Sequence, residues 1–173
     1  MTIQAVLRQQ LTGYHDILEQ TIADCGQETV DKNPGGGATI TNIGSIYVHT
    51  VFSEDGILHG MLQKKPPIYK TGNWAARTNV EMPASPELTV EWGRSVKVNL
   101  PAFREYARAV YAATDAYVAA LSDADLDRKV DTGFIGEQTV AFVLSNVLGW
   151  HAAEHTGEIA ALKGVQGLKG LQF

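Results

Sequence analysis

The sequence predicts a mainly α-helical (all-α) protein, a four-helix bundle with a long crossover between the second and third helices. Four stretches repeat apolar residues at helical spacing, and glycine and proline residues separate them. Residues 61–100 carry no helical repeat, and a connection of this length is typical of a crossover. Because 173 residues match the size of one domain, we expect residues 1–173 to form a single bundle.

The first two helices differ in how their apolar residues are arranged. Over residues 3–25 these residues form one stripe, as in a helix with a single buried face. The second helix begins at Thr41 or Asn42, whose side chains suit an N-cap, and continues to Gly60. Its apolar residues lie all around the helix, which predicts burial on more than one side and association with a second copy of the chain.

The third helix has the clearest pattern, with one apolar face over residues 101–121. The fourth begins between Gly136 and Thr139 and ends before Gly164. Weak alternation of apolar and polar residues marks two pieces of the crossover, residues 88–92 and residues 95 to 99. For these two pieces the sequence allows either short strands or extended loop.

The composition excludes several classes of function. Fourteen lysine and arginine residues against nineteen aspartate and glutamate residues give a net charge of -5, which argues against binding to nucleic acid or to an anionic membrane. The single cysteine, Cys25, excludes an intramolecular disulfide and a four-thiolate metal site. We expect neither a signal peptide nor a membrane span, so the predicted location is the cytoplasm.

Two histidines of the fourth helix carry the main chemical signal. His151 and His155 are four residues apart, so their imidazoles lie on one face of the helix and can reach a single metal ion. Both also belong to the apolar stripe, where buried imidazoles need partners for their ring nitrogens. A metal ion supplies such partners; hydrogen bonds to carbonyl groups or between the rings are the alternative.

His49, in the middle of the second helix, is the candidate for a third ligand. Three neutral imidazoles with a fourth position left for water are the ligand set of catalytic zinc, and the same donors suit nickel, copper and iron(II). Glu158, about one turn after His155, is a candidate to orient that ring by accepting a hydrogen bond. The remaining histidines, His15 and His59, are interpreted as a residue flanking the first helix and a residue at the end of the second.

Two other metal motifs fit the sequence less well. His151-Ala-Ala-Glu154-His155 matches the H-x-x-E-H pattern of inverted zinc metalloproteases, but only eighteen residues follow it, and the one acidic residue among them is Glu158. A di-iron bundle requires Glu-x-x-His on two helices, and no histidine of this chain has glutamate three positions earlier. We therefore expect a mononuclear site.

The order of these residues resembles the DinB-like family of metal-binding four-helix bundles. The similarity covers essentially the whole chain and is most specific over residues 150–164, WHAAEHTGEIAALKG, which contain the pattern H-x-x-x-H-x-G-E/Q-I. The resemblance implies an up-up-down-down bundle, frequently dimeric, in which His49, His151 and His155 hold a divalent metal ion. Some relatives use low-molecular-weight thiols such as mycothiol or bacillithiol in transfer or isomerisation reactions.

These observations predict a metal-dependent enzyme with a small-molecule substrate, either a hydrolase or a low-molecular-weight thiol transferase. The expected cofactor is a divalent ion (zinc, nickel or iron), with a low-molecular-weight thiol as a further candidate. No catalytic acid or base is assigned, and we expect the substrate or thiol pocket to lie in residues 61–100. The alternative function is a non-catalytic bundle that binds a small ligand or a partner, with the histidines satisfied internally.

Overall fold

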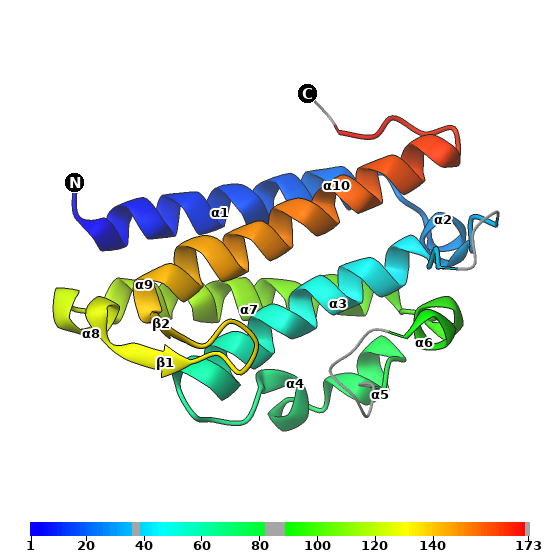
Figure 1. The fold of residues 1–173 in the computed structure, drawn as a ribbon. Coiled ribbons are helices and arrows are strands. Elements are labelled where there is room, and N and C mark those ends of the chain that lie inside the picture. The colour runs from blue at the N-terminus through cyan, green and yellow to red at the C-terminus, as the bar shows by residue number, and fades with distance from the viewer. Residues whose placement is uncertain (36–38, 82–88, 172–173) are drawn as a thin grey trace.

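Four long helices pack side by side in the computed structural model, which describes residues 1–35, 39–81 and 89–171 (Figure 1). They are α1 (Ile3–Ile22), α3 (Ile43–Asp55), α7 (Leu100–Ala120) and α10 (Gly149–Val165). Both α1 and α3 contact α7 and α10, so α1 and α3 occupy opposite corners of the bundle. The predicted mainly α fold with a crossover between its second and third long helices is confirmed.

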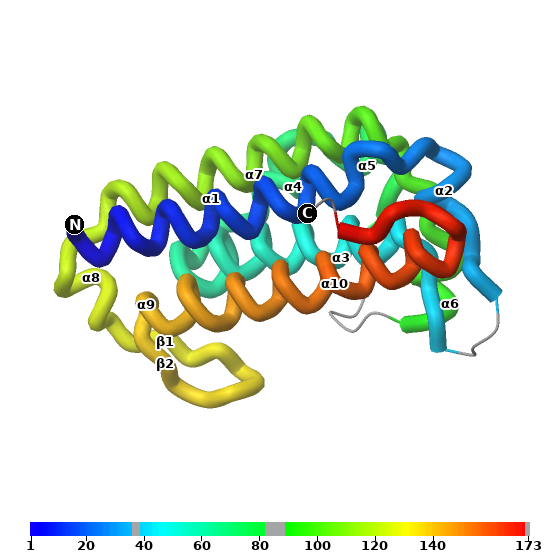
Figure 2. Tube along the Cα trace, turned by 90° about the horizontal axis from the view of Figure 1, so that it is seen from above, coloured from blue at the N-terminus to red at the C-terminus, as the bar shows by residue number. Residues whose placement is uncertain are grey.

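The directions of the helices differ from the expected order. Helices α1 and α10 run one way and α3 and α7 run the other, so the bundle is up-down-down-up rather than up-up-down-down (Figure 1, Figure 2). The chain reverses after α1 through a short connection that contains α2 (Gln27–Asp31). The long crossover then returns the chain to the end where α3 began, which makes the neighbouring helices α3 and α7 parallel.

The crossover contains helices that the sequence pattern did not indicate. After α3 the chain continues as the π-helical segment η1 (Gly56–Leu62), most of which lies within the predicted second helix. The described part of the crossover then forms three short helices that show no sequence repeat: α4 (Ile68–Thr71), α5 (Trp74–Thr78) and α6 (Val90–Ser95). The strand alternative is wrong for the described residues, because 90–95 are helical and 96–99 have no regular secondary structure. Residue 88 lies outside the described residues.

A small hairpin precedes the last long helix. After α7 the chain forms the short helix α8 (Asp123–Asp127) and then the hairpin of β1 (Lys129–Asp131) and β2 (Glu137–Thr139), whose strands are antiparallel. The chain then continues through α9 (Val140–Phe142) and a second π-helical segment, η2 (Val143–Leu148), directly into α10. Thr139 caps this composite helix by accepting a hydrogen bond from the backbone N–H of Phe142 at 3.0 Å, which agrees with the predicted start.

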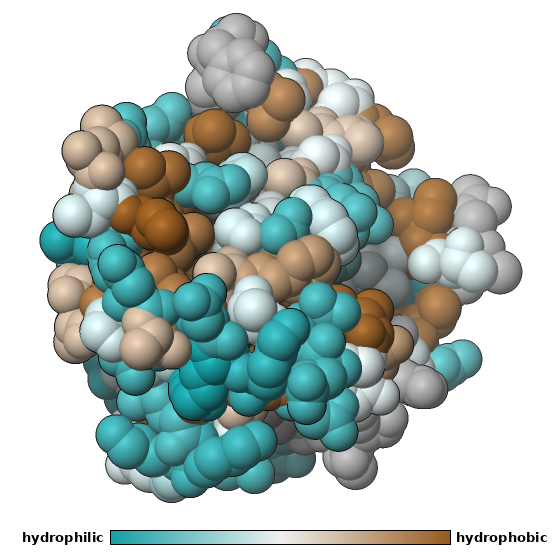
Figure 3. All heavy atoms as spheres, turned by 60° about the vertical axis from the view of Figure 1, so that its left-hand side comes forward, coloured by the Kyte–Doolittle hydropathy of each residue, from teal (hydrophilic) through white to brown (hydrophobic). Residues whose placement is uncertain are grey.

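Helix α3 is buried on almost all sides, as predicted, because α4 and α6 also contact it. The apolar side chains of α3 are therefore buried against other helices of the same chain. The prediction that they promote association with a second copy is wrong. Exposed large apolar side chains lie elsewhere and include Phe134, Ile135 and Trp150. In the view from the end of the bundle near the hairpin, polar side chains dominate the lower part and apolar ones gather above it (Figure 3). Within the described residues, no helix is both long and apolar enough to cross a membrane.

Asp55, the last residue of α3, joins the crossover to the bundle. Its carboxylate is 1 % exposed and accepts hydrogen bonds from the backbone N–H groups of Ile68 and Tyr69, both at 3.0 Å. The hydroxyl of Tyr106 and Nδ1 of His59 also approach it, both at 2.7 Å. Burial, with the charge of Asp55 as a further cause, raises the pKa of Tyr106 well above its ordinary value, so this hydroxyl stays a donor. His59 is thus a buried partner of Asp55 rather than a simple helix-end residue.

Asp55→Asn is expected to lower the free energy of unfolding by about 2–4 kcal/mol, because the new amide group faces donors and leaves at least one of them unsatisfied in the interior. Urea denaturation followed by circular dichroism measures this loss. Asp16→Asn makes the same chemical change at an exposed position of α1 and is expected to cost less than about 0.5 kcal/mol. Equal stability of the Asp55 variant and the parent would rule out the anchoring role.

Candidate metal centre

Three histidines meet where α3 packs against α10. Among His49, His151 and His155, no ligand atom lies more than 4.8 Å from another. The Nε2 atoms of His49 and His151 are 3.0 Å apart, although 102 positions separate these residues in the sequence. The spacing of four residues places His151 and His155 on the same side of α10, and their ring centroids are 4.4 Å apart. The structure therefore brings all three predicted ligand residues together.

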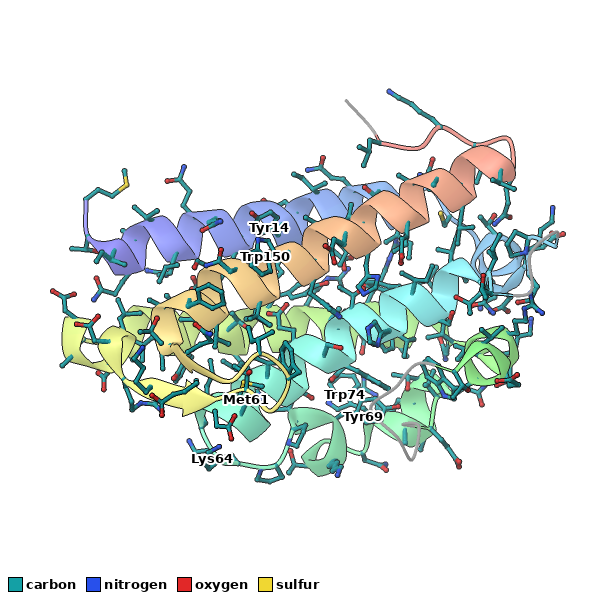
Figure 4. All side chains as sticks on the ribbon, in the orientation of Figure 1. Tyr14, Met61, Lys64, Tyr69, Trp74 and Trp150 are labelled. Atoms are coloured by element: carbon teal, nitrogen blue, oxygen red, sulfur yellow. The ribbon has the colours of Figure 1, made fainter. Side chains whose placement is uncertain are left out.

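Two features of the fourth helix shape the backbone next to His151. The π-helical segment η2 winds wider than an α-helix immediately before α10, and such segments often lie at functional sites. Gly149 follows it and faces Tyr14 of α1, whose ring would lie 3.0 Å from a Cβ atom at this glycine. Helices α1 and α10 therefore approach closely two residues before His151; Tyr14 and Trp150 mark this region in Figure 4.

Glu158 holds the ring of His155. Nδ1–H of His155 donates a hydrogen bond to Oε2 of Glu158 at 2.7 Å. This contact fixes the proton on Nδ1 and leaves the lone pair of Nε2 directed away from the carboxylate. Glu158 thus lies where the sequence predicted it, on the outer side of the histidine cluster.

Burial keeps two of the three imidazoles neutral. It lowers the pKa of His49 to about 4 and the pKa of His151 to about 3, and the neighbouring ring of His155 is the second cause in both cases. Both side chains therefore have unprotonated lone pairs at neutral pH. Because metal ligands must be deprotonated, binding of an ion does not have to displace a proton from these two rings.

The donor set fits a divalent ion of the zinc type. Two nitrogen ligands bound to one ion at about 2.1 Å lie roughly 3.0–3.4 Å apart, depending on the bond angle. The pair His49 and His151 already has a separation of 3.0 Å, and a ring movement of roughly 1–2 Å brings the third ligand into range. Nickel and iron(II) accept the same donors. The 3.0 Å contact is also a hydrogen bond between two neutral rings, which is the internal alternative considered above.

His15 belongs to a different cluster and was wrongly predicted to flank its helix. Its ring is buried, and Nε2–H donates to Oε2 of Glu54 at 3.0 Å. Glu54 also accepts a hydrogen bond from the hydroxyl of Thr114 at 2.5 Å, and the His15 ring stacks on Tyr111 with the centroids 3.9 Å apart. The sequence contained a signal, since His15 lies four residues after Leu11 on the buried stripe. This cluster ties α1, α3 and α7 together and takes no part in the metal centre.

A cavity of about 380 Å³ adjoins the histidine cluster between α3, α10 and the start of α6. His49, His155 and Glu158 form part of its wall. The sequence predicts the substrate pocket in residues 61–100, and Val90 is the one described lining residue from that segment. Among the described residues, most of the wall comes from the bundle helices and from residues 39–41, so the expected contribution of residues 61–100 is limited there to Val90.

Comparisons with known proteins agree with the observed fold. The model of the DinB superfamily matches residues 10–159. A crystal structure of a conserved protein from Enterococcus faecalis superposes with a TM-score of 0.81 at 19 % sequence identity, covering 95 % of this chain and 97 % of that one. At this identity the likeness shows a shared fold alone. No curated protein matches the chain significantly.

Glu158→Gln is expected to weaken metal binding about 10–100-fold, because His155 loses the charged acceptor that orients it and raises its basicity. Competition with a chromophoric chelator measures the dissociation constant. Glu154→Gln, at an exposed position of the same helix, makes the same change away from the rings and is expected to bind as the parent does. A dissociation constant unchanged in Glu158→Gln would show that the hydrogen bond has no influence on the site.

The stability of the metal-free protein is expected to fall as the pH drops from about 7 to 5. In the unfolded chain histidines titrate near 6.5, whereas the folded-state pKa values of His49 and His151 are about 4 and about 3. The unfolded state therefore binds more protons in this range, and acid favours it. Urea denaturation at several pH values, after removal of metal with a chelator, should show a shallower pH dependence for His151→Gln than for the parent. Parallel curves would contradict the neutral state of the half-buried His151.

Proposed function

This chain belongs to the DinB superfamily, and from that premise we propose that it is a metal-dependent enzyme acting on a small molecule through a mononuclear site of His49, His151 and His155. One observation carries the proposal: the Nε2 atoms of His49 and His151, from two different helices, lie 3.0 Å apart. Two ligands of a common ion have this separation. His155, four residues after His151, completes a set of three nitrogen donors that lie within 4.8 Å of one another.

The residues of the chain prepare this site in complementary ways. Burial keeps the lone pairs of His49 and His151 available, and Glu158 orients the third ring. A divalent ion held by such a set lowers the pKa of water or of a thiol toward neutrality and so supplies a nucleophile or a base at neutral pH. Hydrolysis and transfer of a low-molecular-weight thiol are the two reactions that this chemistry serves, and zinc, nickel and iron(II) are the candidate ions.

The exposed position of Glu154 argues against a protease of the inverted zinc type. In that motif the glutamate between the histidines acts at the metal. Here Glu154 is exposed and lies outside the cavity wall, and the ligand cluster found among the described residues contains histidine alone. The arrangement supports a three-histidine centre instead.

A non-catalytic ligand-binding bundle is the second candidate function. The hydrogen bond between His49 and His151 favours it, because each ring then satisfies the other without an ion. A cavity next to the rings would serve a binding protein as well as an enzyme. Metal content separates the two functions.

We predict that residues 1–173 act as one domain in the cytoplasm and that two copies associate. The exposed apolar side chains of Phe134, Ile135 and Trp150 support association, because burying them in a dimer removes apolar surface from water.

Elemental analysis of protein purified without an affinity tag is expected to find about one divalent ion per chain, and the double variant His151→Ala/His155→Ala is expected to lose it. Glu154→Gln, on the same helix, serves as the matched control and should retain the ion. Metal well below one ion per chain in the parent, or equal metal in the parent and the double variant, would favour the non-catalytic bundle.

A further inference from the structure

The cavity beside the metal centre has walls that indicate the chemistry of its ligand. Its volume of about 380 Å³ lies near the lower end of the range of roughly 300–1,000 Å³ typical of small-molecule sites. Apart from His49, His155 and Glu158, the described residues that line it are small or apolar: Thr39, Ile40, Thr41, Ile46, Val90, Ala161 and Leu162. The cavity therefore has room for a compact ligand next to the rings.

The inner wall of the cavity consists of apolar side chains that belong to the hydrophobic core. Ile46 of α3 is 7 % exposed and Leu162 of α10 is 9 % exposed, and both belong to the hydrophobic core cluster of this end of the bundle. Val90, at the start of α6, is half-buried and also lines the cavity. An apolar group placed between these side chains leaves water without displacing any hydrogen bond of the wall, and the hydrophobic effect stabilises it there.

Away from the histidines, the side-chain charges of the cavity disfavour anions. None of the described lining residues is lysine or arginine, so away from the histidines no described side chain of the wall offers a cationic partner to a carboxylate or phosphate group. The carboxylate of Glu158 lies in the same wall and repels a negative charge. Burying an anion, or more hydroxyl groups than Thr39 and Thr41 can pair with, in such a cavity leaves polar groups unsatisfied.

We infer that the substrate is a small uncharged molecule with a compact apolar body, such as a short alkyl group or a single aromatic ring. The apolar body lies between Ile46, Val90 and Leu162, and the reactive end of the molecule faces His49 and His155. The part of this inference that concerns the histidines rests on the proposed function, whereas the preference for an apolar body rests on the cavity alone. Within the class of thiols, the cavity selects against carboxylate-rich and polyhydroxylated molecules.

Three thiols that share the group HS–CH2–CH2– and differ only at the other end test this inference. Isothermal titration calorimetry of the zinc-loaded protein compares 2-phenylethanethiol, 2-mercaptoethanol and 3-mercaptopropanoate. We expect 2-phenylethanethiol to bind at least about tenfold more tightly than 2-mercaptoethanol, because the ring is buried, and 3-mercaptopropanoate to bind most weakly. Equal affinities for the three thiols would overturn the inference.

A variant that fills the mouth of the cavity shows where the aromatic ring binds. Ala161 is exposed and lines the cavity, so Ala161→Phe places a ring in this space with little effect on the core. Ala153→Phe makes the same change at an exposed position of α10 outside the wall. We expect Ala161→Phe to remove most of the tenfold preference and Ala153→Phe to keep it. The same preference in both variants would place the ring elsewhere and overturn the inference.

A metal-free arm separates this inference from the proposed function. 2-Phenylethanol, which needs no metal, is titrated against chelator-treated protein, with ethylene glycol as the polar comparison. Binding of 2-phenylethanol that Ala161→Phe weakens supports the apolar cavity even in a protein that holds no ion, and in that case the proposed enzyme function alone fails. A protein that binds zinc at the histidines but shows no preference for 2-phenylethanol over ethylene glycol would overturn the inference and leave the metal centre standing.

Discussion

The packing of α3 against α10 is the contact on which the candidate site depends. His49 belongs to one helix and the other two histidines to its partner, so a shift of one helix along the other would remove the 3.0 Å approach of their Nε2 atoms. Each of the two helices also packs against other elements: the crossover helices α4 and α6 contact α3, and α1 contacts α10 closely at Gly149. The histidines therefore project from supported helices rather than from loops, which favours a defined ligand geometry.

Buried polar groups keep these helices in register. Glu54 of α3 connects to His15 and α7, whereas the adjacent Asp55 connects to the crossover. Lys163 of α10 has a fully buried amine that donates to the carbonyl of Thr21 in α1 at 2.6 Å. Removing a charged group from water is costly, so such contacts add little net stability, but they are satisfied in one arrangement of the helices only. We interpret them as fixing the position of α3 and α10 relative to α1 and α7.

The three histidines have unequal surroundings. Burial lowers the pKa of His151 most, to about 3, and this ring lies outside the wall of the 380 Å³ cavity. His49 and His155 contribute to that wall, and Glu158 lies beside them. A small molecule in the cavity therefore meets two of the rings directly, while the third supports the site from the interior. Closed structural zinc sites lack such an adjoining space, and this difference favours a centre that exchanges ligands.

The local properties of the protein follow from its sequence. Periodicity identified the four long helices and the pairing of His151 with His155 on one face, and residue type narrowed the cap of the second helix to Thr41 or Asn42, because these features depend on residues within a few turns of each other. Tertiary packing sets the helix directions, the burial of His15 and the described part of the cavity wall. The crossover helices, of four to six residues, are too short to show a repeat and are held by distant contacts such as those of Asp55. Periodicity tells which face of a helix is buried; it carries no information on which distant segment covers that face.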